Sequence, residues 1–398
     1  MQFYQRNATF AMIMKKILLM AMLTLMSASA DAQQLKQRLD SLFSDPLLET
    51  TQMGVMIWDL TTDSMVYGRQ QRQLMRPASA MKVLTAVTAI DVLGSDYTLS
   101  TSLYYHGEIV GRTLVGDLYC VGGMDPMFDT DDMQALVDNV RRLGIDTLRG
   151  RIVADTSVKD TLRWGEGWCW DDDNYDLTPL RMGRRLDFAD QMAAWMVKDG
   201  VVLPDGAHTA RGRLHRDASF VCARTHTLDQ VLHDMMKESN NLYAESVFYQ
   251  LAIKTGHRPA TAKDARKQLR DAMLRAGLLP QQYRVADGSG LSLYNYLSAE
   301  ALTMMLRYAW FDERIYTHLL PSLPIAGEDG TLKHRMIGTP AEKNVQAKTG
   351  TVAGVTSLAG YLTSREGHRL CFAIINQGVM RAADGRQMQD KMCAILCE

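Results

Sequence analysis

The sequence of 398 residues has little cysteine and no excess of charge of either sign. Its six cysteines are too few for a scaffold that depends on disulfides. With the nine histidines they form neither a C-x-x-C nor an H-E-x-x-H arrangement, so we expect no metal site and no cofactor. The 44 Lys and Arg residues nearly cancel the 45 Asp and Glu residues, and no segment gathers basic residues among aromatics. This balance argues against a nucleic-acid partner.

Long hydrophobic runs are also rare, and the clearest one lies near the N-terminus. Two lysines precede an apolar run at residues 17–26, which is followed by small residues with cleavage options after Ala30 or Ala32. This order is typical of a secretory signal peptide, and the run is too short for a permanent membrane span. An ordinary buried helix is the alternative, but the order would then be accidental. We expect residues 1–32 to be the signal, with residues 1–13 upstream of the true start, and the mature protein to be periplasmic, soluble or peripherally bound to the membrane.

Changes of pattern divide the remaining chain into a split domain and an insertion. Residues 33–98 combine a short helix, a hairpin and an apolar helix, whereas residues 99–222 contain short β-like runs, glycines and an aromatic and acidic cluster. Residues 223–398 return to helices and end in strand-like runs and a short helix at 388–396. The outer segments predict one α/β domain, a sandwich in which helices cover an antiparallel sheet built from both chain ends. The middle segment predicts an inserted β-rich domain.

The apolar helix at residues 79–93 carries the first candidate catalytic pair. Ser79 and Lys82 are three residues apart, so on a helix they share a face and can reach each other. Apolar residues surround the pair, which favours a desolvated, neutral Lys82 that can accept the serine proton. A chain of this composition contains roughly one S-x-x-K by chance, and a solvent-exposed pair is the alternative. The apolar surroundings argue against that alternative.

A second motif, S-x-N, lies between two predicted helices at Ser239-Asn240-Asn241. A hydroxyl and an amide could both project from such an interhelical turn. Taken alone, however, the motif is most often a helix N-cap, because Ser and Asn are the residues that helix starts prefer.

A third motif, Lys348-Thr349-Gly350-Thr351, lies inside a strand-like run. The lysine can bind a carboxylate, the two threonines can hydrogen-bond it, and a backbone N–H can donate to an oxyanion. Gly350 interrupts the run where a ligand backbone could approach closely. The alternative is a β-bulge beside a solvated lysine.

The order S-x-x-K, S-x-N, K-T-G is the signature of the penicillin-recognising serine acyl enzymes. From about residue 35 to its end, the chain resembles the class C low-molecular-mass penicillin-binding proteins, the D-alanyl-D-alanine carboxypeptidase/endopeptidase family. Besides the three motifs, the segments that carry this resemblance are LYCVGGMDP at 118–126, GWCWDD at 167–172, KESNNLYAE at 237–245, DGSGLS at 287–292 and GTL at 330–332.

The resemblance implies a transpeptidase-like fold, related to the serine β-lactamases, and a hydrolase that acts on peptidoglycan stem peptides. Ser79 would attack the D-Ala-D-Ala peptide bond or a D-amino-acid cross-link, with Lys82 as its base. Ser239 would relay a proton to the leaving amine, while Asn241 and Lys348 would position the substrate. β-Lactam antibiotics would acylate the same serine as covalent inhibitors.

The resemblance also implies how the substrate is held. Thr349 and Thr351, on either side of Gly350, would bind its terminal carboxylate. The backbone N–H groups of Ser79 and Thr351 would form the oxyanion hole. Asp172 matches an acidic residue of the family's inserted domain and would meet an amino group of the substrate.

Two features depart from the family pattern. The family carries two inserted domains before the S-x-N, yet here Ser79 and Ser239 are only 160 positions apart (239 − 79), and the chain passes from Pro179 almost directly to Asp187. The second insert is therefore missing. The DGSGLS segment is followed in the family by an arginine that helps read a diacid side chain of the stem peptide, whereas Leu293 stands here.

Several alternatives remain open at this stage. Tryptophans in the cluster at residues 164–173 are more often packing residues than substrate contacts. Glu245 is as easily a structural salt-bridge partner as a hydrolytic base. A serine β-lactamase is the closest rival enzyme, although the insertion argues against it. A transpeptidase shares every motif, and a catalytically silent peptidoglycan-binding protein would keep the fold and use the cleft only for docking.

Overall fold

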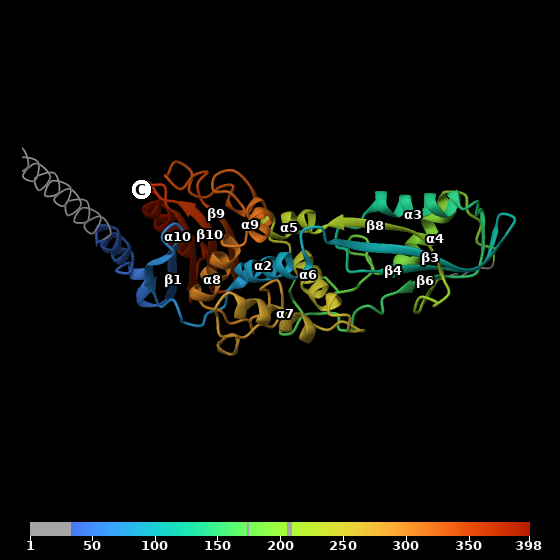
Figure 1. Cartoon of the computed structure of the whole chain (residues 1–398), viewed down its shortest axis with the longest axis horizontal. Coiled ribbons are helices and arrows are strands. Elements are labelled where there is room, and N and C mark those ends of the chain that lie inside the picture. The colour runs from blue at the N-terminus through green and yellow to red at the C-terminus, as the bar shows by residue number, and fades with distance from the viewer. Residues whose placement is uncertain (1–32, 173–174, 205–208) are drawn as a thin grey trace, which may run out of the picture.

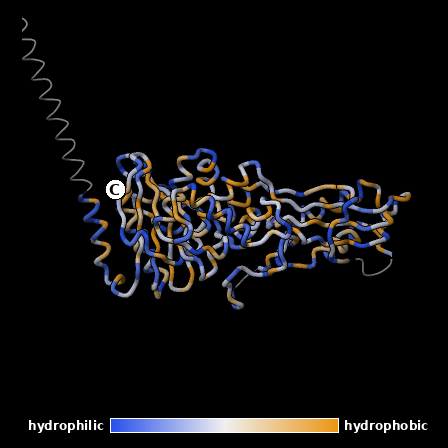
Figure 2. Tube along the Cα trace, turned by 60° about the horizontal axis from the view of Figure 1, so that its bottom comes forward, coloured by the Kyte–Doolittle hydropathy of each residue, from blue (hydrophilic) through white to orange (hydrophobic). Residues whose placement is uncertain are grey.

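The structure is a computed structural model that describes residues 33–172, 175–204 and 209–398. The molecule is elongated, with one body of sheet and helices at one end and a second sheet projecting at the other (Figure 1). Hydrophobic segments are distributed through both bodies, in keeping with separate apolar cores (Figure 2). Within the described ranges, no helix is both long enough and apolar enough to cross a membrane.

The first sheet combines strands from both ends of the chain, as the sequence predicted. Its order is β2-β1-β11-β10-β9, and every neighbouring pair is antiparallel. The strands are β1 (Gln52–Asp59), β2 (Ser64–Arg69), β9 (Gln346–Val352), β10 (Val355–Thr363) and β11 (Arg369–Gln377). The strands β10 and β11 are buried on both faces, which explains their nearly continuous apolar sequence. The strand β9, which carries the third motif, lies at an edge.

Helices cover both faces of this sheet, and alternate residues of β10 enter the two cores. Leu358 packs in the core formed with α10 (Ala382–Cys397) and the helical residues 33–42, whereas Ala359 packs in the larger core on the other face. The predicted sandwich is therefore confirmed. The last helix begins at Ala382 rather than at residue 388, because its first two turns carry few apolar side chains and the sequence pattern did not register them.

The larger core lies around α2 (Met81–Leu93), which starts directly after the 3-10 turn η2 (Ala78–Ala80). All residues of α2 are buried except Asp91 and Val92. Such complete burial follows from a sequence that is apolar on nearly every face of the helix. The helices around it are α5 (Leu228–Lys237), α6 (Asn241–Lys254), α7 (Ala262–Arg275), α8 (Ala299–Trp310) and α9 (Glu313–Ser322).

The second sheet is formed by the inserted segment and has the order β7-β6-β4-β3-β8, with β5 also pairing with β4. It is mixed, because β4 pairs antiparallel with β3 and parallel with β6. Its strands are β3 (Thr98–Val110), β4 (Thr113–Gly122), β5 (Thr147–Arg149), β6 (Ile152–Asp155), β7 (Thr209–Arg211) and β8 (Ser219–Thr227).

The insertion differs in two ways from the β-rich domain expected at residues 99–222. The last strand continues past residue 222 to Thr227, where it leads directly into α5. Two helices also pack on this sheet, α3 (Thr130–Arg142) and α4 (Phe188–Lys198). The sequence did signal α3, because Asp129 and Asp132 form a capping box at its start and an apolar stripe follows.

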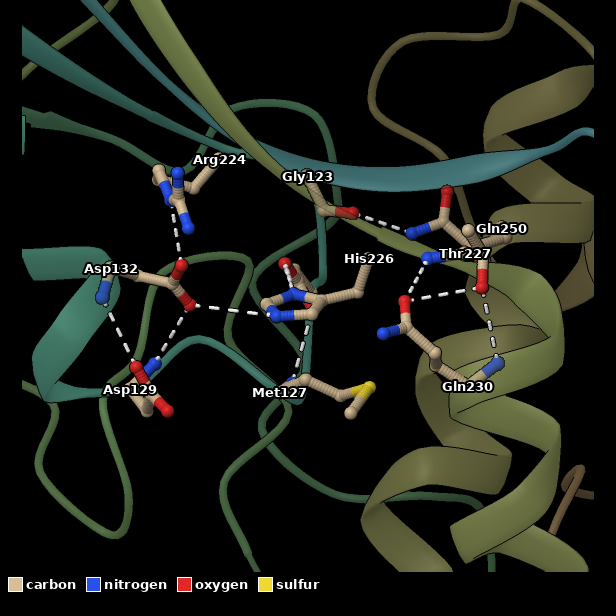
Figure 3. Close-up of polar contacts among 10 residues, drawn as sticks. Gly123, Met127, Asp129, Asp132, Arg224, His226, Thr227, Gln230 and Gln250 are labelled. Carbon is tan, nitrogen blue, oxygen red and sulfur yellow. Dashed lines mark hydrogen bonds and ion pairs between the residues drawn. The ribbon is translucent and has the colours of Figure 1, made fainter. Parts of the chain in front are cut away.

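A polar cluster lies where the insertion meets α5 and α6 (Figure 3). The Nδ1 atom of His226, on β8, lies 2.8 Å from Asp125 Oδ2, and its Nε2 atom lies 3.6 Å from Asp132 Oδ2. From the other side, Gln250 of α6 donates a hydrogen bond to the carbonyl of Gly123. These contacts tie the base of the second sheet to the helical core, and they place the loop after β4 beside α6.

Candidate active site

Ser79 and Lys82 lie at the junction of η2 and α2, and their side chains are in contact. Lys82 Nζ lies 3.0 Å from Ser79 Oγ, 2.7 Å from Asn241 Oδ1 and 2.8 Å from the carbonyl oxygen of Ser289. The last two partners can only accept a hydrogen bond. A neutral amine has two N–H donors, and these two acceptors occupy both. The lone pair of Lys82 is then directed at Ser79, as a base for that hydroxyl requires.

The electrostatic surroundings of Lys82 favour this neutral form. The side chain is completely buried, and burial lowers the pKa of Lys82 to about 7, although Asp287 and Glu245 oppose the shift. Desolvation disfavours the charged ammonium, whereas negative charge on the neighbouring carboxyl groups favours it. The lowered pKa therefore makes the neutral amine, which can accept a proton, accessible near neutral pH.

Two residues beside the site have left-handed backbone conformations that non-glycine residues seldom adopt. Ala78, directly before Ser79, has φ of 47°, and Ser239 has φ of 60°. Strain of this kind persists only where the surrounding structure enforces it, and it is concentrated at functional sites.

The S-x-N turn divides capping and site contacts between its two asparagines. Asn240 caps α6, because its Oδ1 accepts hydrogen bonds from the N–H groups of Leu242 and Tyr243. Asn241 is therefore free to bind Lys82. The interpretation of the motif as a helix N-cap is therefore correct for Asn240 alone. Within the described residues, no side-chain hydrogen bond joins Ser239 to Lys82 or Lys348 in this conformation.

The third motif lies on the edge strand β9, where Lys348 is completely buried. Its Nζ atom donates a hydrogen bond of 2.8 Å to the carbonyl of Thr349. Burial, together with the nearby positive charge of Lys82, holds the pKa of Lys348 well below its usual value. The alternative of a solvated lysine beside a β-bulge is therefore wrong, since β9 and β10 also pair in unbroken register.

Gly350 has no room for a side chain. A β-carbon on it would lie 2.2 Å from Ser357 Oγ and 2.9 Å from the backbone nitrogen of Ala80. The glycine thus lets β9 pack directly against the turn that carries Ser79. The sequence predicted that a ligand backbone approaches Gly350 closely. In the structure, the backbone that lies close to Gly350 is that of the η2 turn.

Two buried acids, Asp287 and Glu245, hold the loop that supplies the Ser289 carbonyl, and neither was assigned this role from the sequence. Asp287 accepts hydrogen bonds from the N–H groups of Gly290 (2.8 Å) and Ser292 (2.7 Å). Glu245 Oε1 accepts from the N–H groups of Gly288 (3.0 Å) and Ser289 (2.8 Å). The sequence contained one signal for this arrangement, an acid that opens the glycine-rich DGSGLS segment.

The insertion reaches this loop through Trp168. Its Nε1–H donates a hydrogen bond of 2.8 Å to Asp287 Oδ2, so this tryptophan packs and also supports the site. Asp172 is half-buried and its Oδ2 accepts from the backbone N–H of Cys169 at 2.7 Å, which closes a turn. No described contact links Asp172 to Ser79. Trp170, which lies between Trp168 and Asp172 in the sequence, is 84% exposed.

The role of Glu245 can be tested by stability measurements. Burial, with a further contribution from Asp287, raises the pKa of Glu245 to about 8. Glu245→Gln keeps the Oε1 acceptor, so we expect a change in the free energy of unfolding below about 1 kcal/mol at pH 7. Glu245→Ala leaves two buried N–H groups unpaired and should cost about 2–4 kcal/mol.

The pH dependence of the free energy of unfolding tests whether Glu245 is protonated in the folded protein. Because the folded protein holds the Glu245 proton up to about pH 8 and the unfolded chain releases it near its ordinary value of 4.5, this group makes stability fall as pH rises between those values. Urea unfolding from pH 5 to 9 should show that slope in the wild type and a shallower slope in Glu245→Gln. Equal slopes would show that Glu245 is ionised in the fold.

Comparison with known proteins identifies the family. A family model described as the D-Ala-D-Ala carboxypeptidase 3 (S13) family matches residues 35–182 and 182–398. The chain belongs to this family. The two matched stretches meet at residue 182, within the region where the sequence lacks the expected second insert. The resemblance to class C penicillin-binding proteins is thus confirmed.

Individual proteins of known name also match most of the chain. A D-alanyl-D-alanine carboxypeptidase from Actinomadura sp. (strain R39) is 29% identical over 92% of this chain and 86% of that protein. Penicillin binding protein 4 (dacB) from Haemophilus influenzae has a similar fold, with a TM-score of 0.80, 22% identity, and coverage of 89% of this chain and 97% of that one. The same protein complexed with a novel β-lactam gives a TM-score of 0.73, with 22% identity and coverage of 91% and 98%.

Proposed function

We propose that this S13 family member is a serine D-Ala-D-Ala carboxypeptidase that cleaves peptidoglycan stem peptides through an acyl-enzyme on Ser79. The observation that carries the proposal is the hydrogen bonding of Lys82, whose two acceptor-only partners direct its lone pair at Ser79 Oγ. The family membership and the similarity to the D-alanyl-D-alanine carboxypeptidase from Actinomadura support the choice of substrate.

In the proposed acylation, Ser79 Oγ attacks the carbonyl carbon of the penultimate D-Ala while Lys82 takes the serine proton. The resulting oxyanion receives hydrogen bonds from the backbone N–H groups of Ser79 and Thr351. Collapse breaks the peptide C–N bond, and Ser239 passes a proton to the departing D-Ala. Water then hydrolyses the ester and regenerates the serine.

The remaining motif residues hold the substrate in this proposal. Asn241 and Lys348 position the reacting peptide bond, and Thr349 and Thr351 bind the terminal carboxylate. The same attack opens a β-lactam ring and leaves a covalent adduct on Ser79. Because the D-Ala-D-Ala substrate lies outside the cytoplasm, we also propose a periplasmic location; the expected signal, residues 1–32, lies outside the described residues.

Incubation of the full chain with peptidoglycan fragments, followed by mass analysis, tests the proposal. We expect release of D-Ala from stem pentapeptides and, because we also propose endopeptidase activity on D-amino-acid cross-links, conversion of cross-linked dimers into monomers. Labelled penicillin should form a long-lived adduct. Rapid turnover of penicillin would instead indicate a β-lactamase, and newly joined strands would indicate a transpeptidase. Binding without product or adduct would show a silent wall-binding protein.

A further inference from the structure

The two faces of β9 present different groups to the substrate. Ala347 packs in the core beneath α10, whereas Gly350 faces Ala80 beside the nucleophile. Side chains alternate along a strand, so Thr349 and Thr351 lie on the α10 side of the sheet edge. Each hydroxyl is already bonded on that side. Thr349 Oγ1 lies 2.7 Å from Thr331 Oγ1, and Thr351 Oγ1 accepts a hydrogen bond of 3.3 Å from Arg386.

Close packing of α10 on β10 places Arg386 at this edge of the sheet. A β-carbon on Gly385 would lie 2.3 Å from Thr356 Oγ1, so the helix approaches the sheet without a side chain between them. Thr356 is the register partner of Thr351. The carbonyl of Arg386 accepts a hydrogen bond of 3.2 Å from Arg335, which is itself paired with Asp390 at 2.6 Å.

Arg386 has no carboxylate partner among the described residues, unlike two nearby arginines, Arg335 and Arg381. Arg335 pairs with Asp390, and Arg381, in the same helix region, pairs with Asp384 at 3.0 Å. An exposed guanidinium that donates to a substrate-binding hydroxyl and lacks a counter-ion is suited to receive an anion, because it can bind a carboxylate with two parallel N–H groups.

The lysines of the site are poorly suited to that task. Both Lys82 and Lys348 are completely buried, and burial lowers the pKa of each, because desolvation disfavours the charged ammonium form. A carboxylate that leaves water for this cleft needs a counter-charge. Arginine remains protonated under all conditions in which proteins fold.

We propose that Arg386 binds the C-terminal carboxylate of the substrate beside Thr349 and Thr351, and that it makes the site selective for peptides with a free D-Ala terminus. This inference rests on the proposed function, since it assigns a residue to the carboxylate end of the same substrate. In this arrangement Lys348 aligns the peptide bond, and Arg386 supplies the positive charge that binds the carboxylate.

Direct binding separates this inference from the catalytic proposal. The full chain carrying Ser79→Ala is titrated calorimetrically with an acylated Lys-D-Ala-D-Ala tripeptide, once with a free C-terminal carboxylate and once as the C-terminal amide. We expect the acid to bind roughly 10- to 100-fold more tightly than the amide. Adding Arg386→Gln should reduce this ratio to near one, and Arg386→Lys should restore part of it, because lysine supplies charge without the planar fork.

Arg381→Gln is the matched control, because it removes an exposed arginine from the start of the same helix and should leave the ratio unchanged. Thermal unfolding of each variant checks that α10 stays folded. The inference would be overturned if the Arg386→Gln variant still bound the acid more tightly than the amide by the same factor. It would also be overturned if the Ser79→Ala protein with Arg386 intact bound acid and amide equally well. Absence of D-Ala release by the wild type would count against the catalytic proposal alone, since the titration requires no turnover.

Discussion

Replacing Ser79 with alanine is expected to abolish both covalent labelling by penicillin and release of D-Ala. Loss of the nucleophile in a serine enzyme lowers kcat by a factor on the order of 10⁶, which here leaves no measurable turnover. The fold should remain intact, because Lys82 is the only side-chain hydrogen-bond partner of Ser79 Oγ among the described residues, and the small side chain is half-buried. Gel detection of labelled penicillin and chromatographic measurement of D-Ala check the two activities.

The matched control for this change is Ser364→Ala, at an exposed turn where the hydroxyl contacts only its own loop. Labelling and turnover should match the wild type in that variant. Release of D-Ala by Ser79→Ala at more than trace levels would show that another residue is the nucleophile.

The second large effect concerns Lys82 and pH. Because its pKa is lowered to about 7, the fraction of neutral amine rises about tenfold per pH unit below that value and levels off above it. The acylation rate constant at low substrate should follow this curve. Lys82→Met, which fills the same buried space without a base, should reduce acylation by about 10²- to 10⁴-fold and remove the inflection. Stopped-flow acylation with a chromogenic β-lactam from pH 5 to 9 measures both.

Lys159→Met serves as the control for loss of a buried lysine. Lys159 is also buried with a lowered pKa, but it binds Asp160 and Leu162 rather than Ser79. Its substitution should leave the inflection near pH 7 in place. An unchanged profile in Lys82→Met would assign the proton transfer to a different group.

The free energy of unfolding should also depend on pH through Lys82, and the direction of this dependence follows from the lowered pKa. The unfolded chain holds the Lys82 proton up to its ordinary value of 10.5, whereas the folded protein releases it near 7. Between those values the unfolded state binds more protons, so this group makes stability rise with pH. Lys82→Met removes that contribution, and urea unfolding at pH 7 and 9 detects the difference.

Much of the architecture could be predicted because local patterns specify it. The apolar sequence of α2 predicted a helix buried on all sides, and strand-like runs at both chain ends predicted one sheet. The helices of the insertion were missed, although a capping box and an apolar stripe marked α3. Glycines and short β-runs dominated the composition of that segment and hid the helical period.

The candidate site was predicted in part. Ser79, Lys82 and Asn241 were singled out from their motifs, and the structure brings their side chains within hydrogen-bonding distance. Ser239 and Lys348 make no such contact with Lys82 among the described residues. Glu245 was considered as a hydrolytic base or a structural ion-pair partner, yet it is buried and binds backbone N–H groups of a loop 43 to 44 residues away.

The sequence by itself determined which chemical groups are present and in which order they follow along the chain. A motif can be recognised because it involves only residues that are close in sequence and share one face of a helix or strand. Only the tertiary structure decided the state of those groups. Lys82 is oriented toward Ser79 because two distant carbonyl oxygens can occupy its N–H donors, and Arg386 reaches Thr351 because α10 packs closely on β10. Desolvation and donor–acceptor geometry depend on segments far apart in the chain, and no local pattern encodes them.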